Sequence, residues 1–260
     1  MKASGYKKII GYSAVVIAIC VASECVATQF RTYDLFLPRP VTLLRFFLNN
    51  PAQFFIASIY TCTKILAGLV LGLIVATALS LAGVWFPSIR PVLTRVTLWS
   101  QTMPVPLLSP LLGLAFGYNL WSASIVTALI CFFPVYLGWE QGRMALPLDV
   151  SLLAASYRPS RITYTRHILL PAGFPYALLG VKGAINLAVL GAVIAEFGAA
   201  SQGLGRLMVR GIRELSPAQS WGAMLILVGI AATMAVIVGR IQRSDRFSYI
   251  GGPHDFSSNT

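Results

Sequence analysis

Charged side chains are scarce in this sequence, and acidic ones are the rarest. Charged residues make up 11% of its 260 residues, whereas hydrophobic residues make up 57%. Soluble globular domains carry about 25% charged residues, so the composition excludes a water-soluble enzyme, an acidic tail protein and a disordered linker. What remains is a helical protein that crosses a membrane several times.

Recognisable catalytic chemistry is also lacking. The sequence has no GxxxxGK[ST] phosphate loop, no HExxH, no GxSxG and no carboxylates paired at a useful spacing. Its two histidines have no partner cluster, and its four cysteines lie in apolar stretches without forming a CxxC pair. We therefore expect no catalytic residue, no metal and no bound cofactor. If the protein moves a solute uphill, the energy has to come from an ion gradient or from another subunit.

Long apolar blocks are present instead. A spanning helix needs about 20 apolar residues, and the blocks lie at 9–28, 54–84, 96–118, 122–139, 171–195 and 219–238. They predict an all-α polytopic membrane protein with about six transmembrane helices. The first block, preceded by lysines, also fits a signal peptide, but we favour a retained span. We expect an external loop with a short amphipathic helix at 43–47, and a glycine-rich loop at 196–218.

The basic residues give a net charge of +12 and lie at the ends of the apolar blocks, not in a stripe interleaved with aromatics. This distribution argues against nucleic acid as a partner and is typical of topology determinants and of contacts with membrane lipid. With six spans, the side that holds both termini, the 84–95 flank and the 140–170 loop carries twice as many Lys and Arg residues as the other. The positive-inside rule makes that side cytoplasmic, together with both termini.

Two features inside the blocks indicate a route across the membrane. Lys64 lies within the second block, where an isolated charge is costly and usually faces protein or a water-filled cavity. Pro104, Pro106 and Pro110 interrupt the third block, which therefore cannot be one straight helix. Broken backbone at membrane depth needs cover from protein or a wet cavity. The break is thus a candidate for the translocation path, and a short surface helix joined to a shorter span is the alternative.

Carboxylates near the spans are few. An ion-coupled transporter usually carries several intramembrane acids, but here only Glu24, Glu140 and Glu196 lie near spans, all towards the ends of blocks. This favours transport driven by a partner subunit that docks on the long polar segment at 140–170. An ion-gradient-driven secondary transporter is the alternative, and a membrane scaffold without transport is a third.

The residues of that polar segment resemble a known motif. Residues 148–161 read LDVSLLAASYRPSR and residues 168–175 read ILLPAGFP, which is similar to the EAA loop of permeases from binding-protein-dependent ABC importers. Counting back from the Leu-Pro places Leu152, Leu153 and Ala154 on the family's EAA, and Arg158 on its glycine. AEF with ASQGLG at 195–205 resembles the family's external stretch after the fifth span. FLPRP at 36–40, Ala57-Ser58 with Ala67-Gly68 and Gly72, and MPVP at 103–106 resemble the nitrate, sulfonate, taurine and bicarbonate branch.

The resemblance covers about residues 36–240 and implies a type I ABC importer permease with the MetI-like fold, in the bacterial inner membrane. The expected organisation is an N-terminal transmembrane helix and flank at 1–35, a permease core at 36–240 and a cytoplasmic tail at 241–260. In this family the EAA segment is a coupling helix that inserts into a groove on the ABC ATPase subunits, which bind the ATP. An extracytoplasmic solute-binding protein and a second permease copy, here expected to form a homodimer, complete the system.

The coupling residues that the resemblance carries over are Asp149, Leu152, Leu153, Ala154, Ala155, Arg158, Pro159, Arg161 and Pro171. Alanine is also the strongest helix former, so helix packing alone would explain Ala154 and Ala155 without the surrounding motifs. The ATPase subunits are expected at 149–167 and the binding protein near 196–217.

Two positions depart from the motif. Leu152 stands where the family has glutamate, and Arg158 stands where it has a glycine that ends the helix with positive φ. Because Pro159 biases the residue before it towards extended geometry, we expect an extended Arg158 and a bend kept by another route. We predict helices at 149–157 and 161–170, with Leu152 making an apolar contact. A permease that couples weakly, or that pairs with a different permease chain, is the alternative.

The same branch imports small anions and some pyrimidine-type vitamin precursors. The resemblance therefore predicts a small and anionic solute, such as nitrate, a sulfonate, taurine or bicarbonate. Lys64, Lys182 and Asn186 would attract an anion, and Lys182 pairing with a neighbouring helix is the alternative. The residues assigned to the translocation path are Lys64, Pro104, Pro106, Lys182, Asn186 and Glu196.

Overall fold

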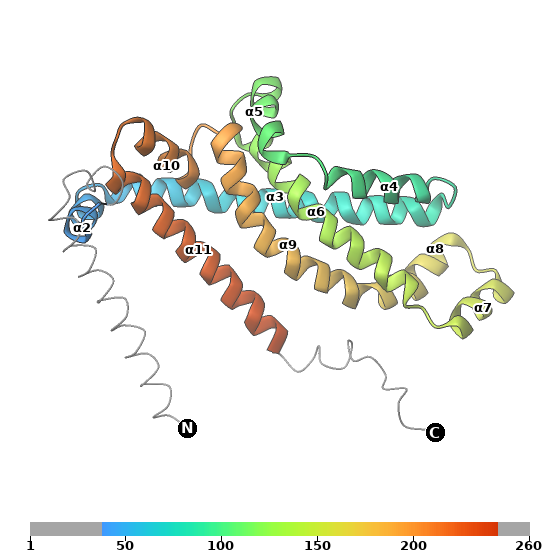
Figure 1. The fold of residues 1–260 in the computed structure, drawn as a ribbon. Helices are drawn as coiled ribbons and strands as arrows, with labels where there is room; N and C mark the ends of the chain where they lie inside the picture. The colour runs from blue at the N-terminus through green and yellow to red at the C-terminus, as the bar shows by residue number, and fades with distance from the viewer. Residues whose placement is uncertain (1–37, 244–260) are drawn as a thin grey trace, which may run out of the picture. The chain divides into compact units, whose positions relative to one another are not determined.

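The computed structural model of the chain describes residues 38–243 (Figure 1). The predicted span at 9–28 and the tail from 244 lie outside the described residues. Within them, the regular structure is helical. The helices are α2 (Pro40–Asn49), α3 (Pro51–Trp85), α4 (Arg90–Ser100), α5 (Val105–Phe116), α6 (Leu120–Met144), α7 (Leu148–Tyr157), α8 (Arg161–Tyr164), the π-helix η2 (Thr165–Leu169), α9 (Leu170–Gly198), α10 (Leu204–Arg213) and α11 (Pro217–Arg243).

Four helical stretches of the described chain are long and apolar enough to cross a membrane. They are Pro51–Trp85, Leu120–Met144, Arg161–Gly198 and Pro217–Arg240. These stretches match four of the predicted blocks. The third block is interrupted as expected, because α4 ends at Ser100 and α5, which begins at Val105, has only 12 residues. The prediction of a glycine-rich loop at 196–218 is wrong in part. α9 runs to Gly198, and α10 occupies half of residues 199–218.

Contacts between residues divide the chain into two compact units. The described part of the first unit comprises residues 38–60 and 202–227, and that of the second comprises 61–201 and 228–243. In the first unit, α2 confirms the short amphipathic helix predicted at 43–47. Phe47 of α2 stacks on Phe54 of α3, with ring centroids 4.4 Å apart. The stacked pair fixes α2 against the start of α3.

The turn between α10 and α11 in the first unit is held by side chains of α11. Gln219 Nε2 donates to the Leu207 carbonyl oxygen at 3.2 Å, and Ser220 Oγ donates to the Met208 carbonyl oxygen at 3.0 Å. Both acceptors lie on α10, so the two helices are joined by hydrogen bonds as well as by the chain.

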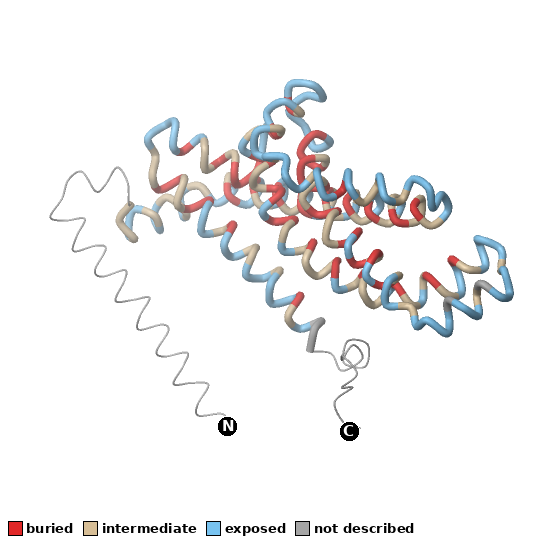
Figure 2. Tube along the Cα trace, turned by 45° about the vertical axis from the view of Figure 1, so that its right-hand side comes forward, coloured by how far each residue is buried: buried red, intermediate tan, exposed pale blue. Residues whose placement is uncertain are grey.

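The second unit is built around α6 and α9, which lie side by side (Figure 1). Glycines allow the two backbones to touch. A Cβ on Gly142 would lie 2.5 Å from the Cα of Gly173, and one on Gly180 would lie 2.3 Å from the Pro134 carbonyl oxygen. Buried residues recur along both helices (Figure 2). Small residues at this contact are typical of helix packing in membranes, where close approach provides the attraction.

Helix α3 joins this pair through the same kind of contact. A Cβ on Gly68 would lie 2.3 Å from Thr127 Cβ of α6, and one on Gly72 would lie 3.2 Å from Cys131 Cβ. Cys131 is fully buried. Thr127 also lies against α9, where a Cβ on Gly191 would lie 3.0 Å from Thr127 Cα. Thr127 is therefore the point where α3, α6 and α9 meet.

The backbone contact of α6 and α9 generates a stability prediction. We expect Gly142→Ala to lower the free energy of unfolding by about 1–3 kcal/mol, because the new methyl group meets backbone that cannot rotate away. The matched control is Gly229→Ala on α11, where an added Cβ meets nothing within 4 Å and helix propensity favours alanine by about 1 kcal/mol. Fluorescence of the detergent-purified variants measures their unfolding transitions. An equal shift of the transition in both variants would contradict this packing.

Candidate functional site

The polar segment at 140–170 contains a helix where the sequence predicted one at 149–157. α6 ends at Met144, and α7 begins four residues later, at Leu148, and ends at Tyr157. Most of α7 is exposed (Figure 2). Its large apolar side chains are among the exposed ones, with exposed fractions of 75% at Leu148, 59% at Leu152, 62% at Leu153 and 80% at Tyr157. Contiguous exposed apolar surface of this kind marks an interaction site.

Arg158 ends α7 in the left-handed conformation, with φ 44° and ψ 55°. The expectation that Pro159 would force Arg158 into extended geometry is therefore wrong. The Arg158 N–H donates to the Ala154 carbonyl oxygen at 3.0 Å, which closes the last turn of the helix. The closed last turn of α7 therefore outweighs the preference of Pro159 for an extended residue before it. The left-handed conformation costs about 1–2 kcal/mol for a residue with a Cβ. Arg158 thus has the positive φ that favours glycine.

A second helical stretch follows the bend, as predicted. Ser160 caps α8 by accepting a hydrogen bond from the Thr163 N–H at 3.1 Å. The π-helix η2 then carries the chain into α9, and the Leu170 N–H donates to the Thr165 carbonyl oxygen five residues back. Pro171 has no N–H to continue the ordinary ladder. The predicted helix at 161–170 therefore does not stop before Pro171 but runs on into the span.

The remaining coupling residues lie along the same stretch. Asp149 is exposed in the first turn of α7, Ala154 and Pro159 are half-buried, and Pro171 is exposed in the first turn of α9. Arg161 is exposed and its guanidinium donates to the Trp85 carbonyl oxygen at the end of α3. The side chain of Ala155 lies outside the described part of the structure.

Two of the predicted path residues are brought together inside the second unit. Lys64 of α3 and Glu196 of α9 form an ion pair, with Nζ and Oε1 3.0 Å apart and side chains 3% and 0% exposed. Thr61 Oγ1 donates to the same Glu196 oxygen at 2.7 Å. Lys64 therefore faces protein, one of the two environments expected for an intramembrane charge. In this conformation the pair joins two spans and presents neither charge to an open passage.

The other predicted path residues are more accessible. Pro104 and Pro106 are exposed around the start of α5, and Asn186 is exposed on α9. Lys182, one turn before Asn186, is half-buried. Their assignment to the path stays a prediction.

A second buried charge was not assigned a role from the sequence. Glu140 of α6 is 5% exposed, and its Oε2 accepts from Arg143 Nη2 at 2.6 Å and from Arg90 Nε at 3.3 Å. The i,i+3 spacing of Glu140 and Arg143 could have indicated this ion pair from the sequence. The Arg90 contact joins two residues that are 50 positions apart in the chain, which no local pattern indicates.

Comparison with known proteins identifies the class. Residues 44–244 match the family described as binding-protein-dependent transport system inner membrane component, and the chain belongs to this family. It has the MetI-like fold and is the permease subunit of an ABC importer, a multi-pass membrane protein and not an enzyme. ATPase and binding-protein partners follow from that membership.

Several curated relatives are permeases of different systems. A probable ABC transporter permease protein of Haemophilus influenzae is 34% identical over 170 residues, which cover 65% of this chain and 68% of the relative. The formylaminopyrimidine transport permease protein ThiX of Halalkalibacterium halodurans is 30% identical, with 65% and 68% covered. The putative aliphatic sulfonates transport permease protein SsuC of Bacillus subtilis is 28% identical, with 52% and 48% covered.

The buried Lys64–Glu196 pair generates a second prediction. Lys64→Met and Glu196→Gln should each lower the free energy of unfolding by about 3–5 kcal/mol, because each removes one charge of the pair and leaves the other buried without its counter-charge. The double variant should lose less than the two single losses together. A thermal unfolding cycle on the four proteins measures this coupling, and strictly additive losses would contradict it. Lys182→Met, at a half-buried lysine, is the matched control and should cost less.

Proposed function

We propose that α7 is the surface through which the partner ATPase subunits drive this permease. The observation that carries the proposal is the exposed apolar side of a helix that lies in the loop between two spans. Leu152 and Leu153 would enter the groove of the ATPase, with Ala154 and Ala155 beside them. Asp149 in the first turn is favourable with the helix dipole. The bend at Arg158 and Pro159, the Arg161 contact and Pro171 would set the angle at which α7 meets the span.

The proposed topology places α7 in the cytoplasm together with both termini. The stretch Arg161–Gly198 is long and apolar enough to cross once, which would place α10 on the outer side. There we propose that the binding protein docks on α10 and on the turn after it. This region carries Arg206, Arg210 and Arg213, and Leu215, which is 76% exposed with φ 51°. An acidic rim around an apolar patch on the partner would complement it.

A second permease copy is proposed to cover α5. This helix exposes Leu107, Leu111 and Leu114 by 59–71%, and its 12 residues span about 18 Å. The hydrocarbon core is about 30 Å thick, so the ends of α5 can lie at membrane depth only where protein covers them. A homodimer supplies that cover, and membrane lipid would contact the remaining apolar faces. The membrane would be the bacterial inner membrane.

The solute is proposed to be small and anionic. The sulfonate relative supports this class, and the formylaminopyrimidine relative widens it to small heteroaromatic molecules. Lys182 and Asn186 lie one turn apart on α9, and a lysine beside an amide offers both charge and hydrogen bonds to an anion. Pro104 and Pro106 at the broken segment would line the same path, with the Lys64–Glu196 pair behind it.

Two surface variants test the proposed docking faces reciprocally. Leu152→Asp should abolish co-purification of the ATPase, because a carboxylate in an apolar groove costs several kcal/mol, while binding-protein capture persists. Leu215→Asp should weaken binding-protein capture and leave the ATPase bound. Both residues are exposed leucines outside the spans, so each variant is the matched control for the other. Pull-down from native membranes with quantitative mass spectrometry measures both, and ATPase recovery with Leu152→Asp would contradict the proposal.

Lys182→Ala tests the path. If Lys182 attracts the solute, uptake of radiolabelled taurine or nitrate, whichever the co-purified binding protein retains, should fall by about tenfold through lost electrostatic attraction. Lys182→Arg keeps the charge and should retain most uptake. Intact uptake by Lys182→Ala at matched expression would remove Lys182 from the path.

A further inference from the structure

Helix α4 is attached to α6 by two polar contacts one turn apart. Arg90, the first residue of α4, donates from Nε to Glu140 Oε2 at 3.3 Å, and its Nη2 lies 3.2 Å from the same oxygen. One turn later, Thr94 Oγ1 and the Tyr136 hydroxyl are 3.0 Å apart. The spacing is four residues on each helix. We call these two contacts the polar ladder.

Glu140 is the centre of this ladder. Its side chain is 6% exposed and one oxygen accepts from two guanidinium groups, those of Arg90 and Arg143. At this burial a charge-assisted hydrogen bond is about twice as strong as a neutral one. The Arg90 stem passes Gly83 of α3, where an added Cβ would lie 3.4 Å from Arg90 Cγ.

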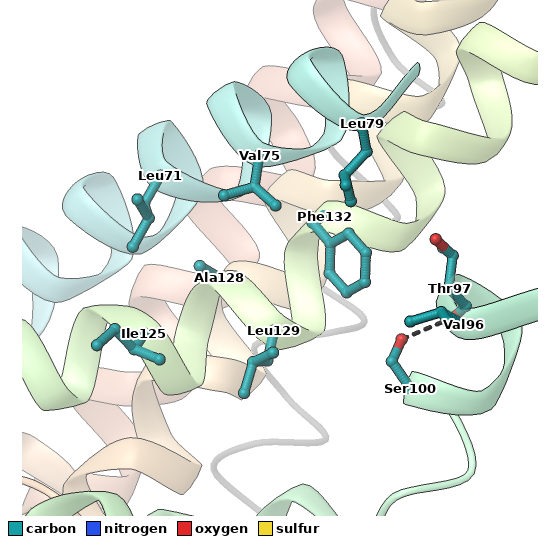
Figure 3. A pocket seen from close by; sticks show the side chains of 10 residues that line it. All are labelled: Leu71, Val75, Leu79, Val96, Thr97, Ser100, Ile125, Ala128, Leu129 and Phe132. Atoms are coloured by element: carbon teal, nitrogen blue, oxygen red, sulfur yellow. Dashed lines mark hydrogen bonds between the residues drawn. The ribbon is translucent and has the colours of Figure 1, made fainter. Parts of the chain in front are cut away.

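The other end of α4 faces empty space. A partly open cavity of about 380 Å³ lies between α3, α4 and α6 (Figure 3). Its walls are apolar apart from the hydroxyl side chains of Thr97 and Ser100. Ser100 Oγ donates to the Thr97 carbonyl oxygen at 2.6 Å, so this hydroxyl is already paired. In the second half of α4, Val96, Thr97 and Ser100 border this cavity, and Thr97 is itself buried.

The ladder lies next to the coupling loop. Glu140 is four residues before the last residue of α6, and α7 begins four residues after that end. Because the glycine contacts keep α6 and α9 together, a displacement of α7 moves the ends of both helices as one body. Arg90 and Thr94 join α4 to this body, and α4 leads directly into the broken segment at 101–104.

We propose that Glu140 is a positioning residue that couples α4 to the ATPase-driven movement of α7. When α7 is displaced, α4 rocks about the polar ladder and its second half moves relative to the cavity, which shifts the broken segment at the proposed path. This inference rests on the proposed docking of the ATPase on α7. It adds to that proposal the helix that α7 moves, which is α4, and the charged residue that transmits the movement, which is Glu140.

The test is a distance measurement in the assembled transporter. Spin labels at Leu98→Cys of α4 and Ile74→Cys of α3, both exposed, report the separation across the cavity after the native cysteines are replaced by alanine. The complex with its co-purified ATPase is measured in nanodiscs, without nucleotide and after trapping with ATP and vanadate. The unmodified ladder should show a nucleotide-dependent shift in this distance.

The ladder variants should lose that shift. Arg90→Gln leaves the Glu140–Arg143 pair intact and is the first choice, because Glu140→Gln leaves two guanidiniums without a counter-charge and can fail to fold. Arg90→Lys keeps the charge and should restore at least part of the shift. Arg95→Gln is the matched control: Arg95 is an exposed arginine of α4 with no ion pair among residues 38–243, and its removal should leave the shift unchanged.

ATP hydrolysis by the same samples separates the outcomes. Retained hydrolysis with a lost shift in Arg90→Gln supports the proposal. An equal shift in Arg90→Gln and the unmodified chain, or no shift in the unmodified chain with the ATPase bound and active, overturns it. Failure of the ATPase to bind the unmodified chain would overturn the docking on α7, and this inference with it.

Discussion

Backbone contact between α6 and α9 is the constraint on which the rest of the second unit depends. At Gly142 and Gly180 the partner helix occupies the space of a side chain, so the pair cannot separate or slide without losing contact along its length. The coupling loop joins these two helices at one end. A force applied to α7 is therefore applied to a stiff two-helix body, and α3 and α4 respond through the few polar contacts that attach them to it.

Those polar contacts are placed at opposite ends of the stiff pair. Glu140 lies near the end of α6, on the side of the coupling loop, and Glu196 lies near the end of α9 on the other side. Each binds a basic residue of a different neighbouring helix, α4 in one case and α3 in the other. Apolar packing in a membrane specifies position weakly because lipid competes for it, whereas a buried charge requires an opposite charge within reach. The two acids thereby fix which helix lies where.

The sequence predicted what depends on composition and on local chemistry. The spans follow from the length of the apolar blocks, the interrupted third block follows from Pro104, Pro106 and Pro110, and α7 follows from the motif at 148–161. It did not predict that Lys64 meets Glu196 or that Arg90 meets Glu140, because these pairs depend on how helices far apart in the chain pack together. Arg158 shows a different limit. Two local preferences compete there, and only the closed last turn of α7 shows which one prevails.

The π-helix at Thr165–Leu169 changes how the chain from Arg161 to Gly198 has to be read. A π-turn inserts one residue beyond the usual helical repeat, and one residue corresponds to a rotation of about 100°. A helical wheel drawn without interruption from α8 into α9 therefore assigns the later residues to the wrong side of the helix. Cysteine substitutions meant to face one surface of α9 should be counted from Leu170 onward.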